Sequence, residues 1–87
     1  MPDQSTLPIA LGRAIRQRRQ ELALTQEQLC DRMALPAERI SYISAVENGQ
    51  RADLKVSRLG LFAEALEMSA GNLLLVASEI IVQEVPA

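Results

Sequence analysis

One run of four residues, Thr25-Gln26-Glu27-Gln28, constrains the fold more than any other feature of this chain. Thr25 stands where an N-cap residue would, and Gln28 can reach back to the Thr25 backbone amide, which is the pattern of a capping box. Leu29 and Met33 follow at i and i+4 spacing, so they share one face of a helix. The sequence therefore predicts a helix that begins directly after Thr25 and turns an apolar face inward.

Helical spacing of apolar residues continues through the rest of the chain, and short connections join the periodic segments. Ser69 is placed to cap the last segment, and Gly49 is a natural residue for a left-handed helix end. No internal repeat or Gly/Ser linker divides the chain. We expect one all-α domain over residues 1–87, a compact bundle of about five helices. The further helices are expected at about 8–23, from 36 to 48, at about 54–67 and at about 70–83.

The composition excludes most classes of enzyme. The chain has no His and only one Cys, Cys30, which rules out a metal site of the usual His/Cys type, a Ser/His/Asp triad, a Cys/His nucleophile and an internal disulfide. No stretch reaches the roughly 18 consecutive apolar residues that a membrane span needs. We expect a cytoplasmic protein that has no catalytic activity, requires no cofactor or metal, and has no membrane partner.

Charge is distributed unevenly along the chain. All nine Lys and Arg residues lie at or before Arg58, together with seven acidic residues, which makes this part +2; the remainder has four acidic residues and no base, which makes it −4. This segregation indicates one surface for an anion and another for a different partner. If the anion is DNA, the affinity should fall steeply with salt, because neutralised phosphates release counterions.

The third predicted helix has an apolar face and a small, polar face. Ile40, Ile43 and Val46 fall on the apolar face and are expected in the core, whereas Ser41 and Ala45 point away from it. Two short helices joined by a tight turn, with small polar side chains on the outer face of the second, are what a reader of the DNA major groove needs.

The stretch from Leu11 to Leu75 resembles the Cro and phage-repressor type helix-turn-helix regulators, the XRE family. The resemblance implies a lambda-repressor-like DNA-binding domain over about residues 8–69, acting as a sequence-specific transcriptional regulator on double-stranded operator DNA. In size and appearance the chain is similar to small plasmid-borne repressors of the KorC sort. The matching blocks are Leu24-Thr25-Gln26-Glu27-Gln28-Leu29, Ile43-Ser44-Ala45-Val46-Glu47-Asn48-Gly49, Leu59-Gly60-Leu61-Phe62-Ala63-Glu64-Ala65-Leu66 and Asn72-Leu73-Leu74.

The resemblance also implies roles for individual residues. Gln26 would bind a DNA phosphate and a neighbouring base-contacting side chain. Arg19 and Glu47 would form a partly buried ion pair that fixes the third helix against the first. The bases would be read by Ser41, Tyr42, Ser44 and Ala45, with Arg39 near the tip, and further phosphates would be bound by Asn48, Arg51 and Lys55.

Two departures from the family pattern affect the turn. The segment from Gln26 to Glu47 is about three residues longer than usual, and the extra length falls around Leu35 to Ile40. Ala34 also replaces the usual glycine and resists positive φ, so we expect an altered turn geometry.

Four side chains have two possible roles each. Tyr42 would either pack on the rim of the bundle or reach a base or phosphate. Arg13, Arg16 and Arg18 would either bind DNA or form a solvated helix face. The three arginines fall mostly outside the apolar stripe of the first predicted helix, which is compatible with either role.

The last predicted helix carries more apolar surface than a thin bundle can hide. One interpretation is burial within the monomer, and the other is a two-fold interface, because a dimer reading two half-sites gains affinity. We expect a repressor that binds a palindromic operator as a homodimer; the alternative is an antitoxin whose last helix, at about 70–85, covers a protein partner, with DNA binding secondary. The residues expected at the dimer interface are Leu74, Ala77, Ile80, Ile81 and Val85.

Overall fold

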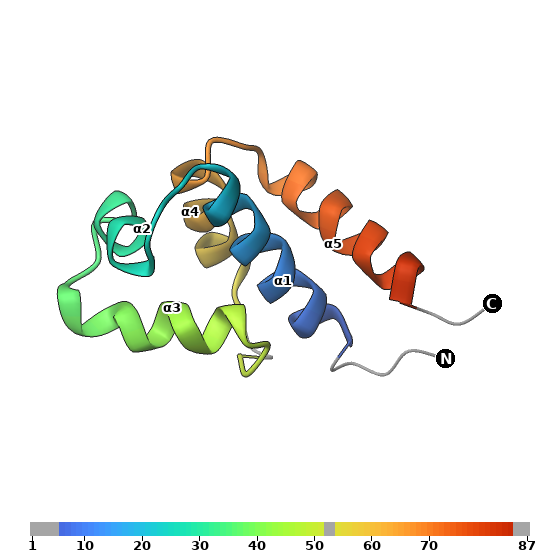
Figure 1. The fold of residues 1–87 in the computed structure, drawn as a ribbon, viewed down its shortest axis with the longest axis horizontal. Coiled ribbons are helices and arrows are strands. Elements are labelled where there is room, and N and C mark those ends of the chain that lie inside the picture. Colours follow the sequence, from blue (N-terminus) through green and yellow to red (C-terminus); the bar gives the residue numbers. More distant parts are fainter. Residues whose placement is uncertain (1–5, 52–53, 85–87) are drawn as a thin grey trace.

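The computed structural model describes residues 6–51 and 54–84, and within these ranges it consists of helices and their connections (Figure 1). The predicted all-α fold of about five helices is confirmed. The elements are α1 (Thr6–Glu21), α2 (Gln26–Arg32), the 3₁₀ turn η1 (Ala37–Arg39), α3 (Ile40–Glu47), α4 (Val56–Ala65) and α5 (Ala70–Glu84).

The helix starts predicted after Thr25 and at Ser69 are present, whereas α3 begins at Ile40, four residues after the predicted start. The Thr25 hydroxyl accepts a hydrogen bond from the Gln28 amide at 3.0 Å, and the Gln28 side-chain oxygen accepts one from the Thr25 amide at 2.8 Å, so the capping box is closed at both ends. The Ser69 hydroxyl accepts a hydrogen bond from the Asn72 amide at 3.0 Å at the start of α5. These bonds satisfy backbone donors that a helix leaves unpaired in its first turn.

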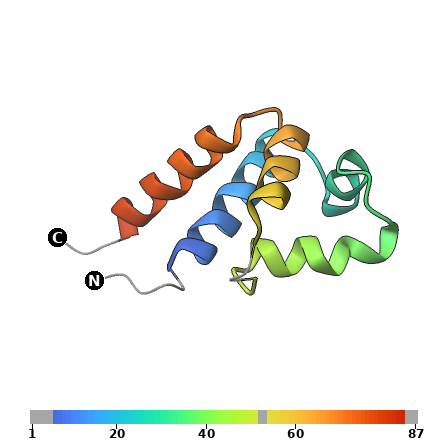
Figure 2. The same cartoon turned by 180° about the vertical axis from the view of Figure 1, so that it is seen from behind.

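α1 is the central element of the bundle. It lies beside α5 on one side and α3 on the other, and the two views in Figures 1 and 2 agree on this arrangement. The largest fully buried hydrophobic side chains are Phe62, Ile15, Leu29, Ile43, Leu66 and Leu73. Ile40, expected in the core, is only partly buried because it opens α3 at the edge of the bundle.

The turn between α2 and α3 corrects the expectation for Ala34. This residue adopts a left-handed conformation with φ of 57°, and the Leu35 amide donates to the Cys30 carbonyl at 3.1 Å. The α2 helix therefore ends in the way usual with glycine, because the closing hydrogen bonds outweigh the cost of the Ala34 Cβ. The extra residues are taken up by Pro36 and the 3₁₀ turn, which leads directly into α3.

α1 and α3 approach each other most closely at Gly12. A Cβ atom at this position would collide with the Val46 carbonyl oxygen and lie 2.6 Å from that of Glu47. At the same end of α3, just after these residues, Gly49 closes the helix with φ of 73°, the predicted left-handed cap. The backbone of α3 thus lies directly on α1 at a point where only glycine fits.

Several apolar side chains of α5 remain exposed. Leu74, Leu75 and Val82 have exposed fractions of 41%, 57% and 74%. Ala77, by contrast, is fully buried within the monomer and presents no surface to a partner, while Val85 lies outside the described residues. Within the described part of the chain no single helix is long and apolar enough to cross a membrane. Ser57–Ala65 and Ala70–Val82 taken together reach the length and apolar composition of a membrane span, but the two segments are bent by 92° relative to each other.

Candidate nucleic-acid interface

α3 forms one edge of the molecule, with α2 packed against it (Figure 1). Ile43 and Val46 are buried beneath α3, whereas Ser41 is exposed and Ser44 and Ala45 are half-buried. The outer face is therefore made of short side chains. An α-helix about 10–12 Å wide matches a major groove about 12 Å wide, and short side chains permit close approach to base edges.

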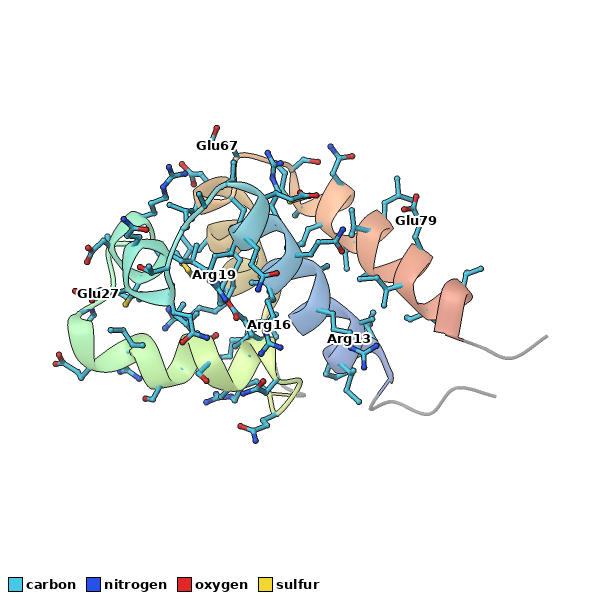
Figure 3. All side chains as sticks on the ribbon, in the orientation of Figure 1. Arg13, Arg16, Arg19, Glu27, Glu67 and Glu79 are labelled. Atoms are coloured by element: carbon cyan, nitrogen blue, oxygen red, sulfur yellow. The ribbon has the colours of Figure 1, made fainter. Side chains whose placement is uncertain are left out.

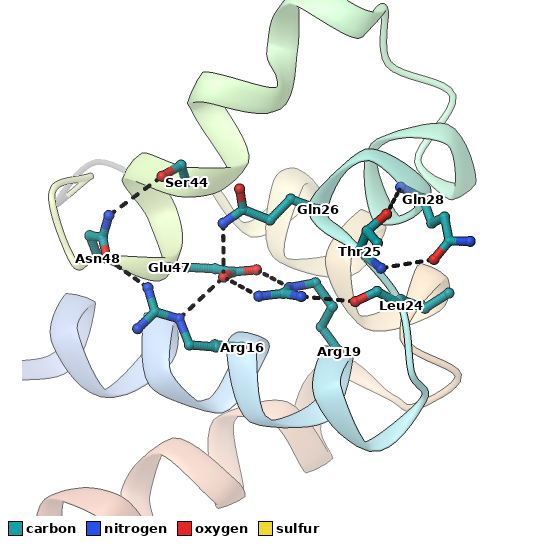
Figure 4. Close-up of polar contacts among 9 residues, drawn as sticks. All are labelled: Arg16, Arg19, Leu24, Thr25, Gln26, Gln28, Ser44, Glu47 and Asn48. Carbon is teal, nitrogen blue, oxygen red and sulfur yellow. Dashed lines mark hydrogen bonds and ion pairs between the residues drawn. The ribbon is translucent and has the colours of Figure 1, made fainter.

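The carboxylate of Glu47 anchors α3 to the first two helices (Figure 4). It is fully buried and lies 2.7 Å from Arg19 Nε through Oε2 and 3.0 Å from Arg19 Nη2 through Oε1. Gln26 Nε2 donates to Oε1 at 3.2 Å, and Arg16 Nε lies 3.3 Å from the same oxygen. The residues that the resemblance assigns to an ion pair thus lie in a network that also includes Gln26 and Arg16.

Two opposing effects act on the pKa of Glu47. Burial alone would raise it, but the hydrogen bonds from Arg19, Gln26 and Arg16 and the charge of Arg19 outweigh burial, so the pKa lies below its ordinary value. The same carboxylate raises the pKa of Arg19, chiefly through their hydrogen bond. Both groups are therefore charged in the folded protein, and the ion pair fixes the distance between α3 and α1.

Arg16 extends this network to the end of α3. Its Nη2 donates to Asn48 Oδ1 at 2.6 Å, and Asn48 Nδ2 donates to Ser44 Oγ at 3.5 Å. Arg16 thus orients the Asn48 amide so that its NH2 group faces Ser44 on the outer face (Figure 4). Helical spacing left the role of Arg16 open; the structure places it in a positioning chain that sequence spacing alone does not reveal.

A second cluster lies between α3 and the start of α4, around Tyr42. The Tyr42 ring stacks on Phe62 with ring centroids 6.2 Å apart, and the guanidinium carbons of Arg51 and Arg58 lie 5.1 Å and 5.6 Å from its centroid. The hollow beside it has a volume of about 260 Å³ and is lined by Arg39, Tyr42, Arg51, Leu54, Lys55 and Arg58.

Four of the predicted DNA contacts are therefore brought to one place, namely Arg39, Tyr42, Arg51 and Lys55. Arg58 also belongs to this cluster and was not among the predicted contacts. The signal for it is its spacing: Arg58 follows Lys55 by three residues, so both fall on one face of a helix.

The described residues offer little for covalent or metal chemistry. Cys30 is buried, and burial is the main reason that the pKa of its thiol is raised. Its Sγ lies 3.3 Å from the Pro36 carbonyl oxygen, so it packs as a structural thiol. Within residues 6–51 and 54–84, no three His, Cys, Asp or Glu side chains are grouped to hold a metal ion.

The fold and this surface define a class of protein, the helix-turn-helix DNA-binding proteins. A family model described as Helix-turn-helix (HTH_3) matches residues 15–73, and the chain belongs to this XRE-type family. Among solved structures, the Clp gene regulator ClgR from C. glutamicum is similar, with a TM-score of 0.74, 26% sequence identity, and coverage of 92% of this chain and 95% of that chain. No curated protein matches the chain significantly. These findings support a DNA-binding regulator.

Proposed function

We propose that the chain is a bacterial, phage- or plasmid-encoded repressor that acts in the cytoplasm and binds a palindromic operator as a homodimer. The observation that carries this proposal is the outer face of α3, whose short polar side chains are backed by the buried Glu47 network. A helix held this rigidly keeps the same residues over the same base edges. Repression then follows sterically, because the bound dimer occupies DNA that the polymerase needs.

The residues divide into base-reading and phosphate-binding groups. Ser41 and Ser44 read base edges, since a hydroxyl both donates and accepts hydrogen bonds, and Ala45 permits close approach. The Gln26 amide, which donates to Glu47 through its nitrogen, lies at the start of α2 and binds a phosphate together with Asn48 at the end of α3. These contacts set the register of α3 on the duplex.

The second half of the proposal is a dimer formed through α5. Leu75 and Val82 lie one above the other at i and i+7, on the side of α5 opposite the buried Leu73 and Ala77. Leu74 adds to this face. Two copies packed through α5 bury these side chains and give an affinity that a single small module lacks.

A selection of bound sequences from random duplex DNA tests the DNA half of the proposal. We expect an inverted repeat whose half-sites are about 34 Å, or one helical turn, apart or a multiple of this. In the Ser44→Ala variant the preference should relax at one position in each half-site and persist elsewhere. Failure to enrich any sequence would contradict a repressor, and a single unrepeated site would contradict the dimer.

Sedimentation of matched variants tests the dimer. Val82→Glu and Leu75→Glu add a charge to the exposed face of α5 and should yield monomers. Leu61→Glu is the control, because Leu61 is an equally apolar side chain that is 39% exposed on α4, and it should remain dimeric. A monomeric wild-type protein at micromolar concentration that gains solubility from a co-expressed protein partner would favour an antitoxin whose α5 covers a toxin.

A further inference from the structure

The cluster around Tyr42 concentrates positive charge in one hollow. Four of its six lining residues are cationic, namely Arg39, Arg51, Lys55 and Arg58. Two of these cations, Arg51 and Arg58, lie at cation–π distance from a single ring, 5.1 Å and 5.6 Å from its centroid. Cationic side chains that line one hollow attract a negatively charged group.

The backbone at this place adds to the attraction for an anion. Lys55 is the N-cap of α4, and its own side chain makes no capping hydrogen bond. The first turn of α4 contains no acidic residue. The positive end of the α4 dipole therefore opens beside the same cationic side chains, and both favour a negatively charged group.

The Tyr42 ring is held from behind. It is half-buried and stacks on Phe62, a fully buried core residue, with an angle of 27° between the two rings. Because Phe62 belongs to α4 and Tyr42 to α3, the stack also fixes the separation of these helices. A ring supported in this way is a rigid surface on which flexible arginine side chains can be ordered.

We infer that Tyr42 is a positioning residue that presents Arg51 and Arg58 to one phosphodiester group of the DNA strand beside the groove that α3 enters. This inference rests on the proposed DNA binding and deepens it. It gives Tyr42 a role in affinity that is independent of base sequence, and it adds Arg58 to the phosphate-binding residues. The hydroxyl of Tyr42 is not required; the face of the ring is.

The test is DNA binding by fluorescence anisotropy over about 50–200 mM salt, with the selected operator and with a duplex of shuffled sequence. The variants are Tyr42→Phe, Tyr42→Leu and Arg58→Gln. The control is Arg32→Gln, which removes the same charge from the Arg32–Glu67 pair; Glu67 lies on the side of the molecule away from α3 (Figure 3). Thermal melting of each variant monitors its fold.

For Arg58→Gln we expect the slope of log affinity against log salt to fall by about 1.8 for the bound dimer, about 0.9 for the one phosphate that each protomer no longer neutralises. Tyr42→Leu should lower affinity for both duplexes by the same factor, about three- to tenfold, as expected when an ordered cation–π interaction is removed, and should also reduce the slope. Tyr42→Phe and Arg32→Gln should remain within about twofold of the wild type, since each preserves the ring and the cations around it.

Two results would overturn the inference. A change in base preference in Tyr42→Phe would show that the hydroxyl reads a base. An unchanged salt slope in both Tyr42→Leu and Arg58→Gln would show that the cluster is structural. The repressor proposal would fail separately, if the wild-type protein bound the shuffled duplex as tightly as the selected one. The phosphate site could still be measured on the shuffled duplex, so the two failures are distinguishable.

Discussion

Replacing Gly12 with alanine adds a methyl group between α1 and α3. The new Cβ would collide with the Val46 carbonyl oxygen and lie 2.6 Å from the Glu47 carbonyl oxygen and 2.9 Å from the carbon of the same group. These neighbours are backbone atoms of a helix, so they cannot rotate away. The two helices must therefore separate, which also lengthens the contacts of Glu47 with Arg19.

Two opposing effects set the magnitude. Alanine in place of glycine in a helix interior stabilises the folded protein by about 1 kcal/mol, because the unfolded chain then has less conformational entropy to lose on folding. Overpacking a core costs about 1–3 kcal/mol, and weakening a buried ion pair costs up to about 3 kcal/mol more. The steric effect prevails, and we expect Gly12→Ala to lower the free energy of unfolding by about 2 kcal/mol.

Gly60 provides a matched control. It lies in α4, and a Cβ there would meet no atom within 4 Å, so Gly60→Ala makes the same chemical change without the clash. Urea unfolding followed by circular dichroism should show Gly60→Ala stabilised by about 0.5–1 kcal/mol while Gly12→Ala is destabilised. Equal stability of Gly12→Ala and wild type, or equal losses in both variants, would refute the argument from helix contact.

Three further predictions concern the network and the helix ends. Glu47→Gln should lower the free energy of unfolding by about 3–5 kcal/mol, because Arg19 loses its buried partner. Since the folded pKa of Glu47 is lowered, the stabilisation from Glu47 is present above the ordinary pKa of 4.5 and is lost as the pH falls through the lower folded pKa. Acid unfolding titrations of the variant should therefore lack this component. Thr25→Ala should cost about 1 kcal/mol by thermal unfolding, and no loss would contradict the capping role. Ala34→Gly should stabilise by up to about 1 kcal/mol in the same assay, because φ of 57° favours glycine; destabilisation would contradict a left-handed Ala34.

Much of the fold follows from rules that act within one turn of a helix. The capping box at Thr25, the Ser69 cap and the left-handed Gly49 are local hydrogen-bonding patterns, and the sequence predicts them at the positions where they occur. The inward stripe containing Ile15 and Phe62 follows in the same way from helical periodicity. The family motifs also predict one contact between distant parts of the chain, the ion pair of Arg19 and Glu47.

How separate helices meet follows from three-dimensional packing and not from local sequence patterns. The Arg16–Asn48 contact, the Gly12 approach to α3 and the gathering of Arg58 with Tyr42 join residues that are 16 or more positions apart. Such contacts depend on crossing angles and on the depth of packing, which helical periodicity does not encode. The same reason applies to Ala77, whose place on an apolar face did not reveal whether α1 or a second copy would cover it. Local patterns were enough to place the starts of α2 and α5 and the face that most helices bury, because caps and helical periodicity act within a few residues. The site arose from packing, because several helices must contribute side chains to it at once.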